Sequence, residues 1–381
     1  MSLVVFLFCS SQNSELAVIL KDPETYNRRI MKFILLLFIV LISSQAYSQN
    51  DSLKKLNFSA YGELYYSYDF SNPQNHEKSN FLYNHKRHNE LNANLLLLRA
   101  TYLDKNYRAN LGLMVGNYAQ YNLSSEPTWA QFIYEANVGI KISKKQNIWL
   151  DAGIMPSHIG FESAVSADCW TLTRSLLAEN SPYYETGFKL GYTSKDEKLN
   201  ILTLYLNGWQ KISKPDYIQK PSFGTQINYK LSKKLLLNYS TFFGTDKPDS
   251  IKAFRQFHNF YLQYEPTNKF GIIAGFDIGM DKFNSTTYGT WYSPVLIIKQ
   301  SINKKTRVVF RGEYYYDPKQ IIISTGTTNG FQTFGLSSNF DYDLNDKIKF
   351  RIEGKIFHSK DKIFVNENNN YSLTTNMTVK L

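Results

Sequence analysis

The segment IKFRIEGKIF, residues 348–357, alternates residue by residue between two kinds of side chain. Its first set is apolar or small, and its second carries four charges: Ile348, Phe350, Ile352, Gly354 and Ile356 against Lys349, Arg351, Glu353, Lys355 and Phe357. Successive side chains of a β-strand point to opposite faces, so this pattern places the charges in file on one face and an apolar row on the other. Such a strand needs an apolar environment on one side and a polar one on the other.

The same alternation recurs along the chain. Blocks of about ten residues follow one another after Gln49, separated by breaks rich in Asn, Lys, Asp and Ser. We count about sixteen blocks, and fourteen to eighteen remain compatible with the pattern: 56–70, 89–103, 107–119, 131–142, 147–155, 183–193, 199–208, 222–231, 235–245, 254–265, 269–280, 291–302, 306–316, 329–343, 347–358 and 371–381. The aromatic content of 15% also favours strands over helices.

The breaks between blocks alternate in length. Breaks after even-numbered blocks are short, as at 104–106, 194–198, 232–234 and 345–346. Breaks after odd-numbered blocks are mostly long, as at 71–88, 120–130, 156–182 and 360–370. Short turns on one rim and long loops on the other are typical of a transmembrane barrel with short periplasmic turns and long extracellular loops. The expected fold class is therefore all-β, an antiparallel up-and-down barrel of about sixteen strands.

Two further patterns favour a barrel in a membrane over a soluble sandwich. Several apolar rows end in aromatic residues, as at 66–70, 314–316 and 340–342, which is typical of the aromatic girdle at a membrane interface. The last block alternates as far as Leu381 and suits the closing strand of a barrel, which barrel-assembly machinery recognises. A secreted β-sandwich whose polar face meets water remains the alternative.

The N-terminal residues differ from the rest. From Met31 the chain reads MKFILLLFIVLISSQAYSQN, with a basic residue, an apolar run and a small-residue cleavage site. We expect residues 1–48 to be an upstream leader plus a secretory signal peptide, with the true start at Met31 and cleavage after Ser48. The apolar run is too short for a membrane-spanning helix. Residues 49–381 then form a single barrel domain, in which Cys169 is alone and forms no intramolecular disulfide.

The charged row of segment 348–357 is expected to face the barrel interior. Lys349, Arg351, Glu353 and Lys355 would lie near three charged residues of the strand two places earlier, namely Arg307, Arg311 and Glu313. Charges of both signs can pair across such a wall while staying hydrated. These seven residues are therefore candidates for the lining of a water-filled lumen.

The break at 156–182 is the longest irregular stretch, and loops of this length in a compact architecture are usually functional. Residues 168–179 could form a short helix. We expect the loop to fold inward and narrow the lumen, with Glu162, Asp168 and Arg174 at a constriction that sets ion or solute preference. The alternative is a loop on the outer rim, with Trp170 and Leu176 as its own small core.

Three segments carry a family resemblance: NHKRHNE (84–90), DAGIMPSHIGFESA (151–164) and WTLTRSLLAENSPYYETGFKLGY (170–192). They resemble the β-barrel porin-2, or OmpL-like, family of Gram-negative outer membranes. The resemblance spans most of residues 49–381 and is densest from 84 to 210. It implies an outer-membrane barrel with pore activity, and it implies no catalytic residues and no defined substrate.

Enzymatic chemistry has little support in the sequence. His85 and His88 lie three apart, but Lys86 and Arg87 between them disfavour a metal ion. A dyad of His158 with Ser157 or Ser163 would lack a recognisable motif around it. No glycine-rich phosphate loop or metalloprotease motif is present in the sequence. We expect no enzyme activity, no cofactor and no metal site.

The net charge limits the classes of binding partner that fit this chain. The formal charge is +11, and it falls to +10 when residues 1–48, with four basic and three acidic residues, are removed. For an exported protein this excess does not indicate nucleic-acid binding. It is more consistent with pairing to lipopolysaccharide phosphates, or with a lumen that prefers anions.

The sequence thus predicts an integral outer-membrane channel for diffusion of small hydrophilic solutes, with anion preference. One alternative is a closed barrel that serves as a surface receptor or adhesin through its loops. Another is a secreted β-sandwich that binds glycans, which would fractionate outside the membrane. Whether the barrel forms a homo-oligomer is left open.

Overall fold

The computed structural model of the chain describes residues 55–282 and 286–381. The predicted leader, signal peptide and cleavage site lie outside the described residues. Sixteen strands make up nearly all of the regular structure: β1 Leu56–Asp69, β2 Leu91–Leu103, β3 Tyr107–Val115, β4 Ile133–Lys141, β5 Asn147–Pro156, β6 Tyr184–Thr193, β7 Leu199–Leu206, β8 Ser222–Ser232, β9 Leu235–Gly244, β10 Arg255–Tyr264, β11 Phe270–Lys282, β12 Tyr288–Ser301, β13 Thr306–Asp317, β14 Phe331–Asp343, β15 Ile348–Ser359 and β16 Asn369–Lys380.

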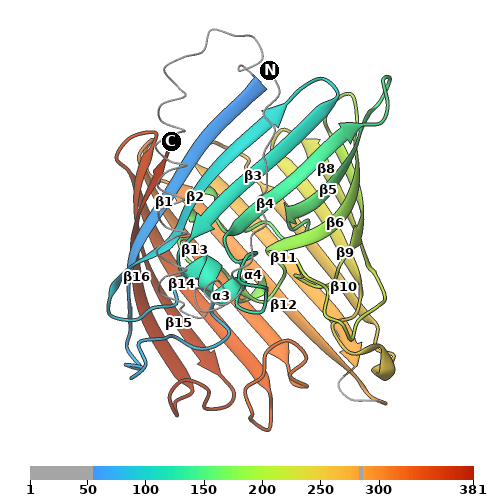
Figure 1. The fold of residues 1–381 in the computed structure, drawn as a ribbon. Helices are drawn as coiled ribbons and strands as arrows, with labels where there is room; N and C mark the ends of the chain where they lie inside the picture. Colours follow the sequence, from blue (N-terminus) through green and yellow to red (C-terminus); the bar gives the residue numbers. More distant parts are fainter. Residues whose placement is uncertain (1–54, 283–285) are drawn as a thin grey trace, which may run out of the picture. The chain divides into compact units, whose positions relative to one another are not determined.

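The strands form one closed barrel in which each pairs antiparallel with its neighbours in the chain (Figure 1). The barrel closes where β1 pairs with β16, with Tyr61 opposite Lys380 and Asp69 opposite Ser372. Closure satisfies the backbone groups of both terminal strands and leaves no sheet edge exposed. The predicted fold class and the count of sixteen strands are confirmed.

Loop lengths alternate as the sequence predicts. The turns after even-numbered strands are short, and most connections after odd-numbered strands are long. We call the two rims the turn end and the loop end. The first and last strands both have their free ends at the turn end, where the amide of Ala60 donates to the carbonyl oxygen of Leu381 at 3.0 Å.

One predicted strand is too long. The block 107–119 remains a strand only to Val115, and a short helix, α3, covers Asn117–Asn122. Gly116 separates them with a φ of 120°, a conformation that favours glycine. A Cβ at Gly116 would lie 2.6 Å from the carbonyl oxygen of Asn94, so the chain turns here where only glycine fits.

Outward and inward faces differ sharply in polarity. Large apolar side chains on the outward positions are exposed, for example Leu336 at 49% and Phe350 at 41%. The predicted aromatic rows also face outward, with Tyr66 and Tyr342 each 38% exposed. In residues 55–282 and 286–381, none of the helices has the length and hydrophobicity needed to span a membrane.

Apolar side chains pack together inside the barrel toward the loop end. Phe81 of the loop between β1 and β2 packs edge-on against Phe331, with ring centroids 4.7 Å apart. This contact belongs to an apolar cluster inside the barrel, which we call the loop-end cluster: Phe81, Leu82, Ile159, Leu176, Leu204, Leu206, Phe242, Phe257, Trp291, Tyr315, Ile323, Phe331, Phe357 and Phe364. The inward face is therefore polar toward the turn end and partly aromatic toward the loop end.

Candidate functional site

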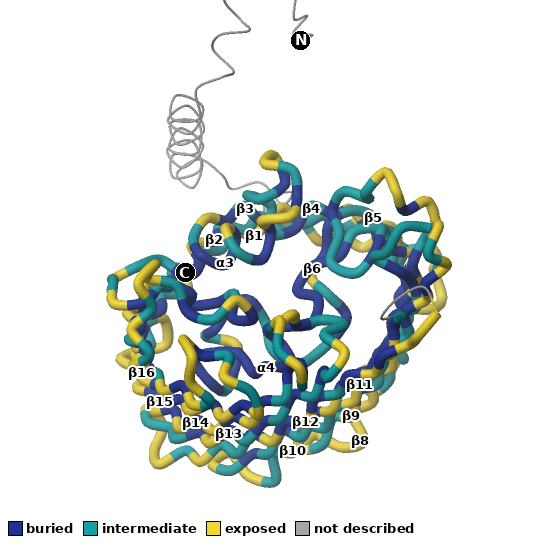
Figure 2. Tube along the Cα trace, turned by 90° about the horizontal axis from the view of Figure 1, so that it is seen from below, coloured by how far each residue is buried: buried dark blue, intermediate teal, exposed yellow. Residues whose placement is uncertain are grey.

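The connection 157–183 runs inside the barrel and is hereafter called the inner loop (Figure 2). Its regular structure is one 3-10 turn, Ser166–Asp168, and one short helix, α4, Leu176–Glu179. Leu172, Arg174 and Leu176 are each 0% exposed. The alternative in which this loop lies on the outer rim is therefore wrong, and the helix expected at 168–179 is shortened to its last four residues.

Arg311 of β13 forms several hydrogen bonds and ion pairs beneath the inner loop. Its guanidinium donates to the carbonyl and hydroxyl oxygens of Thr173 at 2.8 and 3.1 Å, and to the hydroxyl of Thr171 at 2.8 Å. It also pairs with Glu353 of β15 at 2.8 Å and with Glu313 of its own strand at 3.2 Å. A planar guanidinium with five donors suits this simultaneous recognition of carbonyls and carboxylates.

The two carboxylates beside Arg311 bind the loop backbone in turn. Glu353 accepts from the amide of Thr173 at 2.6 Å. Glu313 accepts from the amide of Leu176, at the start of α4, at 2.5 Å. Each buried charge is thus paired and hydrogen-bonded, which is the condition under which burial of charge is tolerated.

The charged row of β15 makes the same kind of contact. Arg351 donates to the carbonyl oxygens of Ser166 at 2.7 Å and Trp170 at 2.8 Å, and pairs with Asp341 of β14 at 2.7 Å. Lys355 donates to the carbonyl oxygen of Arg174 at 3.0 Å. The row that the alternation places on the inward face therefore holds the inner loop by its main chain.

Arg174 and Glu162 act within the loop itself. Arg174 donates to the carbonyl oxygens of Ser163 at 2.6 Å, Leu172 at 2.9 Å and Ala164 at 3.0 Å. Glu162 accepts from the amide of Ser175 at 3.1 Å and from its hydroxyl. Both side chains fold the loop upon itself, and a constriction role for them stays a prediction.

Burial corrects one expectation about the charged wall. Five of the candidates, Arg311, Glu313, Arg351, Glu353 and Lys355, are 1%, 3%, 2%, 1% and 5% exposed, so they are sealed beneath the inner loop and are not hydrated. The candidates nearer the turn end differ. The side chains of Arg307 and Lys349 are 24% and 19% exposed, and Asp168 pairs with Lys380 at 49% exposure.

A buried histidine that no sequence motif marks holds the opposite end of the loop. His158 places Nδ1 2.9 Å from the Glu185 carboxylate of β6 and Nε2 2.9 Å from the carbonyl oxygen of Thr241 in β9. Both partners only accept, so both ring nitrogens donate and the imidazolium fits the site. A Cβ at Gly224 would lie 2.7 Å from this ring, so glycine makes room for it.

Burial alone would lower the pKa of His158, but the Glu185 carboxylate and the hydrogen bonds to both ring nitrogens raise it above the usual value. No sequence motif marks this pair, because the two residues are 27 positions apart and meet only when β5 pairs with β6, which places Met155 opposite Glu185.

Glu63 of β1 is a second buried centre that the sequence does not reveal. Its carboxylate accepts from His85 at 2.7 Å, from Ser166 at 2.7 Å and from Asn376 at 2.6 Å. Glu63 thereby connects the loop between β1 and β2, the inner loop and strand β16, where β1 and β16 close the barrel. Burial lowers the pKa of His85, which therefore serves this junction as a neutral hydrogen-bond donor.

Charged side chains also line the interior near the turn end, apart from the side chains that hold the inner loop, which we call the inner-loop anchor: Arg311, Glu313, Arg351, Glu353 and Lys355. Arg99 of β2 pairs with Glu135 of β4 at 2.6 Å, and Arg108 of β3 pairs with Asp151 of β5 at 2.5 Å. The cations are 37% and 30% exposed, whereas their carboxylate partners are only 4% and 2% exposed. We call this set the turn-end cations; Lys189, 25% exposed and 3.8 Å from Asp151, completes it.

Among residues 55–282 and 286–381, no group of three or more His, Cys, Asp or Glu side chains is arranged to hold a metal ion. Burial raises the pKa of the Cys169 thiol, which keeps it protonated and unreactive.

Comparison with known proteins agrees with this architecture. A family model described as "Putative beta-barrel porin-2, OmpL-like" matches residues 55–381. The chain belongs to this OmpL-like porin family. It thus carries a sixteen-strand barrel of the outer-membrane type, with the inner loop folded into it.

Solved structures with the same fold are outer-membrane porins of low sequence identity. OmpF of Salmonella typhi, in complex with daunomycin, gives a TM-score of 0.60 at 8% identity, covering 86% of this chain and 97% of that one. An anion-selective porin from Comamonas acidovorans gives 0.56 at 9% identity, covering 86% and 99%. The channel DcaP of Acinetobacter baumannii gives 0.53 at 9%, covering 86% and 97%. Curated proteins give no match.

Proposed function

We propose that this OmpL-like protein is an outer-membrane channel through which small hydrophilic solutes diffuse, with a preference for anions. The turn end is then periplasmic and the loop end extracellular. The supporting observation is the unequal exposure of the turn-end cations and their partners. A solute entering this part of the interior meets Arg99, Arg108 and Lys189, while Glu135 and Asp151 lie behind them.

Unequal exposure matters because exposed charges set the field in an aqueous passage. Arg108 and Asp151 form an ion pair whose net charge is close to zero. The guanidinium nevertheless lies closer to the water than the carboxylate does. A low-dielectric wall focuses this positive potential into the passage and raises the local anion concentration. Glu162, Asp168 and Arg174 are proposed to act on this passage indirectly, by fixing the position of the inner loop.

A planar-bilayer recording tests this proposal. The refolded chain in a tenfold KCl gradient is expected to conduct with a reversal potential of the sign for chloride preference. Replacing Arg99 and Arg108 together by Gln is expected to shift that potential toward zero. The matched control is the double replacement of Lys144 and Lys145 by Gln, in the turn after β4. A reversal potential of the cation-selective sign would contradict the anion preference.

A closed barrel with a receptor or adhesin role is the second candidate. The loop-end cluster favours it, because Phe81, Phe331, Phe357 and Phe364 fill space at the extracellular end of the interior. Absence of current at either polarity, from protein that retains its barrel by circular dichroism, would support this candidate over the channel.

The proposed partners follow from location and shape. Lipopolysaccharide phosphates would meet the basic loops, and barrel-assembly machinery would handle the terminal strand β16. A homo-oligomer would use the outward groove between β1 and β5, where Ala100, Ala109 and Ala136 leave room for another barrel. Chemical cross-linking in detergent, compared between this chain and an Ala109→Trp variant, is expected to lose the oligomer in the variant.

A further inference from the structure

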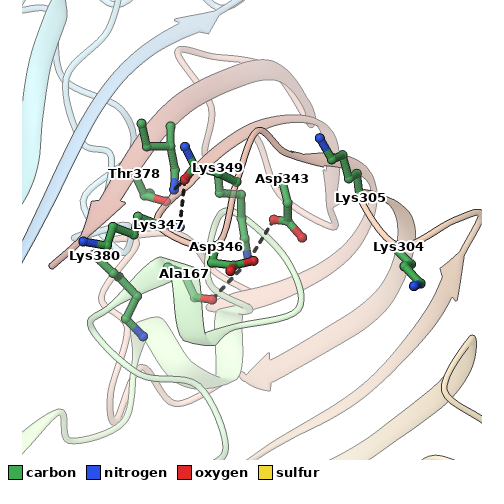
Figure 3. A pocket seen from close by; sticks show the side chains of 11 residues that line it. Ala167, Lys304, Lys305, Asp343, Asp346, Lys347, Lys349, Thr378 and Lys380 are labelled. Atoms are coloured by element: carbon green, nitrogen blue, oxygen red, sulfur yellow. Dashed lines mark hydrogen bonds and ion pairs between the residues drawn. The ribbon is translucent and has the colours of Figure 1, made fainter.

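We infer that the turn end carries a binding site for a multivalent anion of the polyphosphate or phosphate-ester class. The site is a pocket of about 550 Å³ between the turn 302–305, the turn 344–347, the end of β16 and the inner loop. Five lysines line it, together with two aspartates (Figure 3). The inference rests on the proposed channel function, because it names a class of solute that the passage would hold.

The balance of charge in the pocket favours an anion. Asp343 is already engaged by Arg307 at 2.9 Å and lies 4.0 Å from Lys349. Lys380 pairs with Asp168 of the inner loop at 2.5 Å. Among the described residues, Lys304, Lys305 and Lys347 form no ion pair, and Asp346 is the one lining aspartate that is not already paired. A surplus of ammonium groups therefore remains for a ligand.

The arrangement of the lysines indicates more than one anionic group. Lys304 and Lys305 come from one turn, whereas Lys347 and Lys380 come from the next turn and the final strand, on the other side of the pocket in Figure 3. A chain of phosphates offers several anionic groups to lysines on both sides of the pocket, whereas a single small anion offers one. Lysine binds phosphate as a compact charge and tolerates several ligand orientations.

The floor of the pocket belongs to the inner loop. Lys349 donates to the carbonyl oxygen of Ala167 at 3.3 Å, and the neighbouring residue Asp168 holds Lys380. An anion bound here would lie against the innermost part of the loop at the turn end. It would consequently occupy the periplasmic side of the passage and reduce the current of smaller ions.

The test is current block by sodium tripolyphosphate, added to one side at a time during chloride conduction by the full chain. We expect concentration-dependent block from the turn-end side. The double variant Lys304→Gln and Lys347→Gln should need about tenfold more tripolyphosphate, which corresponds to about 1.4 kcal/mol. The matched control is Lys233→Gln with Lys234→Gln, in the turn after β8 at the same rim. Tripolyphosphate should block this variant at the same concentration as the unmodified chain.

The outcomes separate the two proposals. Chloride current without any block by tripolyphosphate would overturn the site and leave the channel intact. Equal weakening in the lysine variant and its control would assign the block to general surface charge and also overturn the site. Without any current, titration calorimetry of tripolyphosphate into the detergent-solubilised chain decides: binding that the double variant loses supports the site, and no binding overturns it.

Discussion

At the scale of single residues, charge in this protein serves mainly to hold a loop. Arg311, Arg351 and Lys355 point inward on their strands, as the alternation requires, yet their hydrogen bonds end on carbonyl oxygens of residues 166–174. A loop buried inside a barrel must satisfy its own backbone groups, since water is excluded from them. The wall supplies the missing donors and acceptors.

Removing one of these donors should release the loop. Arg311→Met is expected to lower the free energy of unfolding by about 3–5 kcal/mol, because Glu313 and Glu353 would remain buried without their partner. The control is Arg307→Met, at a partly exposed position four residues earlier, with an expected loss of about 0–1 kcal/mol. Guanidinium titration in detergent micelles measures both. Equal losses in the two variants would show that the buried ion pairs of Arg311 contribute no more stability than the partly exposed pair of Arg307.

The His158 pair predicts a pH dependence of loop attachment. The pKa of His158 is raised by folding, so its stabilisation is complete below about pH 6.5, the unfolded pKa, and is lost as pH rises through the folded value. Loss of the proton removes one donor to Glu185 or Thr241, worth about 1.5–3 kcal/mol. Trypsin cleavage after Arg174 should therefore accelerate by roughly ten- to hundredfold at high pH.

That pH effect has a matched control. His158→Gln should cleave rapidly at all pH values, whereas His358→Gln, which alters an exposed histidine of β15, should retain the pH dependence. Rates are normalised to trypsin activity on a small ester at each pH. If the cleavage rate of His158→Gln still depends on pH, a group other than His158 causes the pH dependence.

At the scale of elements, each strand is defined by the contrast between its two faces. β14 alternates exposed Leu336 with buried Ser337 and Asn339, and β15 alternates in the same way beside it. The outward face has no protein partner along most strands, so the bilayer is the environment that would cover it.

A single charge on that outward face tests the assignment. Leu336→Arg, at the middle of β14, is expected to destabilise the barrel in lipid by about 2–4 kcal/mol. Leu344→Arg, in the turn just beyond the same strand, should cost about 0–1 kcal/mol because the side chain reaches water at the interface. Unfolding titrations in lipid vesicles compare the two. Similar values would indicate that Leu336 does not face hydrocarbon.

At the scale of the whole molecule, the barrel and its inner loop have separate roles. Strand pairing from β1 to β16 closes the cylinder without help from the loop. The loop then divides the interior, leaving the turn-end cations exposed while sealing the anchor on β13 and β15. Conductance should therefore depend on the loop more than on the wall.

Excision of the inner part of the loop tests this division. Replacing residues 164–173 by two glycines should raise single-channel conductance several-fold, because the lumen is no longer divided. The control replaces residues 195–197 of the turn after β6 by two glycines and should leave conductance unchanged. Circular dichroism checks that both variants keep their strands. Unchanged conductance in the first variant would place the narrowest point outside the inner loop.

The sequence by itself determined the barrel, because period two, turn length and outward hydrophobicity are local properties that each strand of residues 56–380 carries alone. It also determined that Lys349, Arg351 and Glu353 face inward, since a shift of the strand by one residue would move its apolar side chains to the inward face. Only the tertiary structure decided that the inner loop covers Arg311 and Arg351, and that His158 meets Glu185. Those contacts form only when the strands have paired and the inner loop is enclosed, because their energies arise where water is excluded.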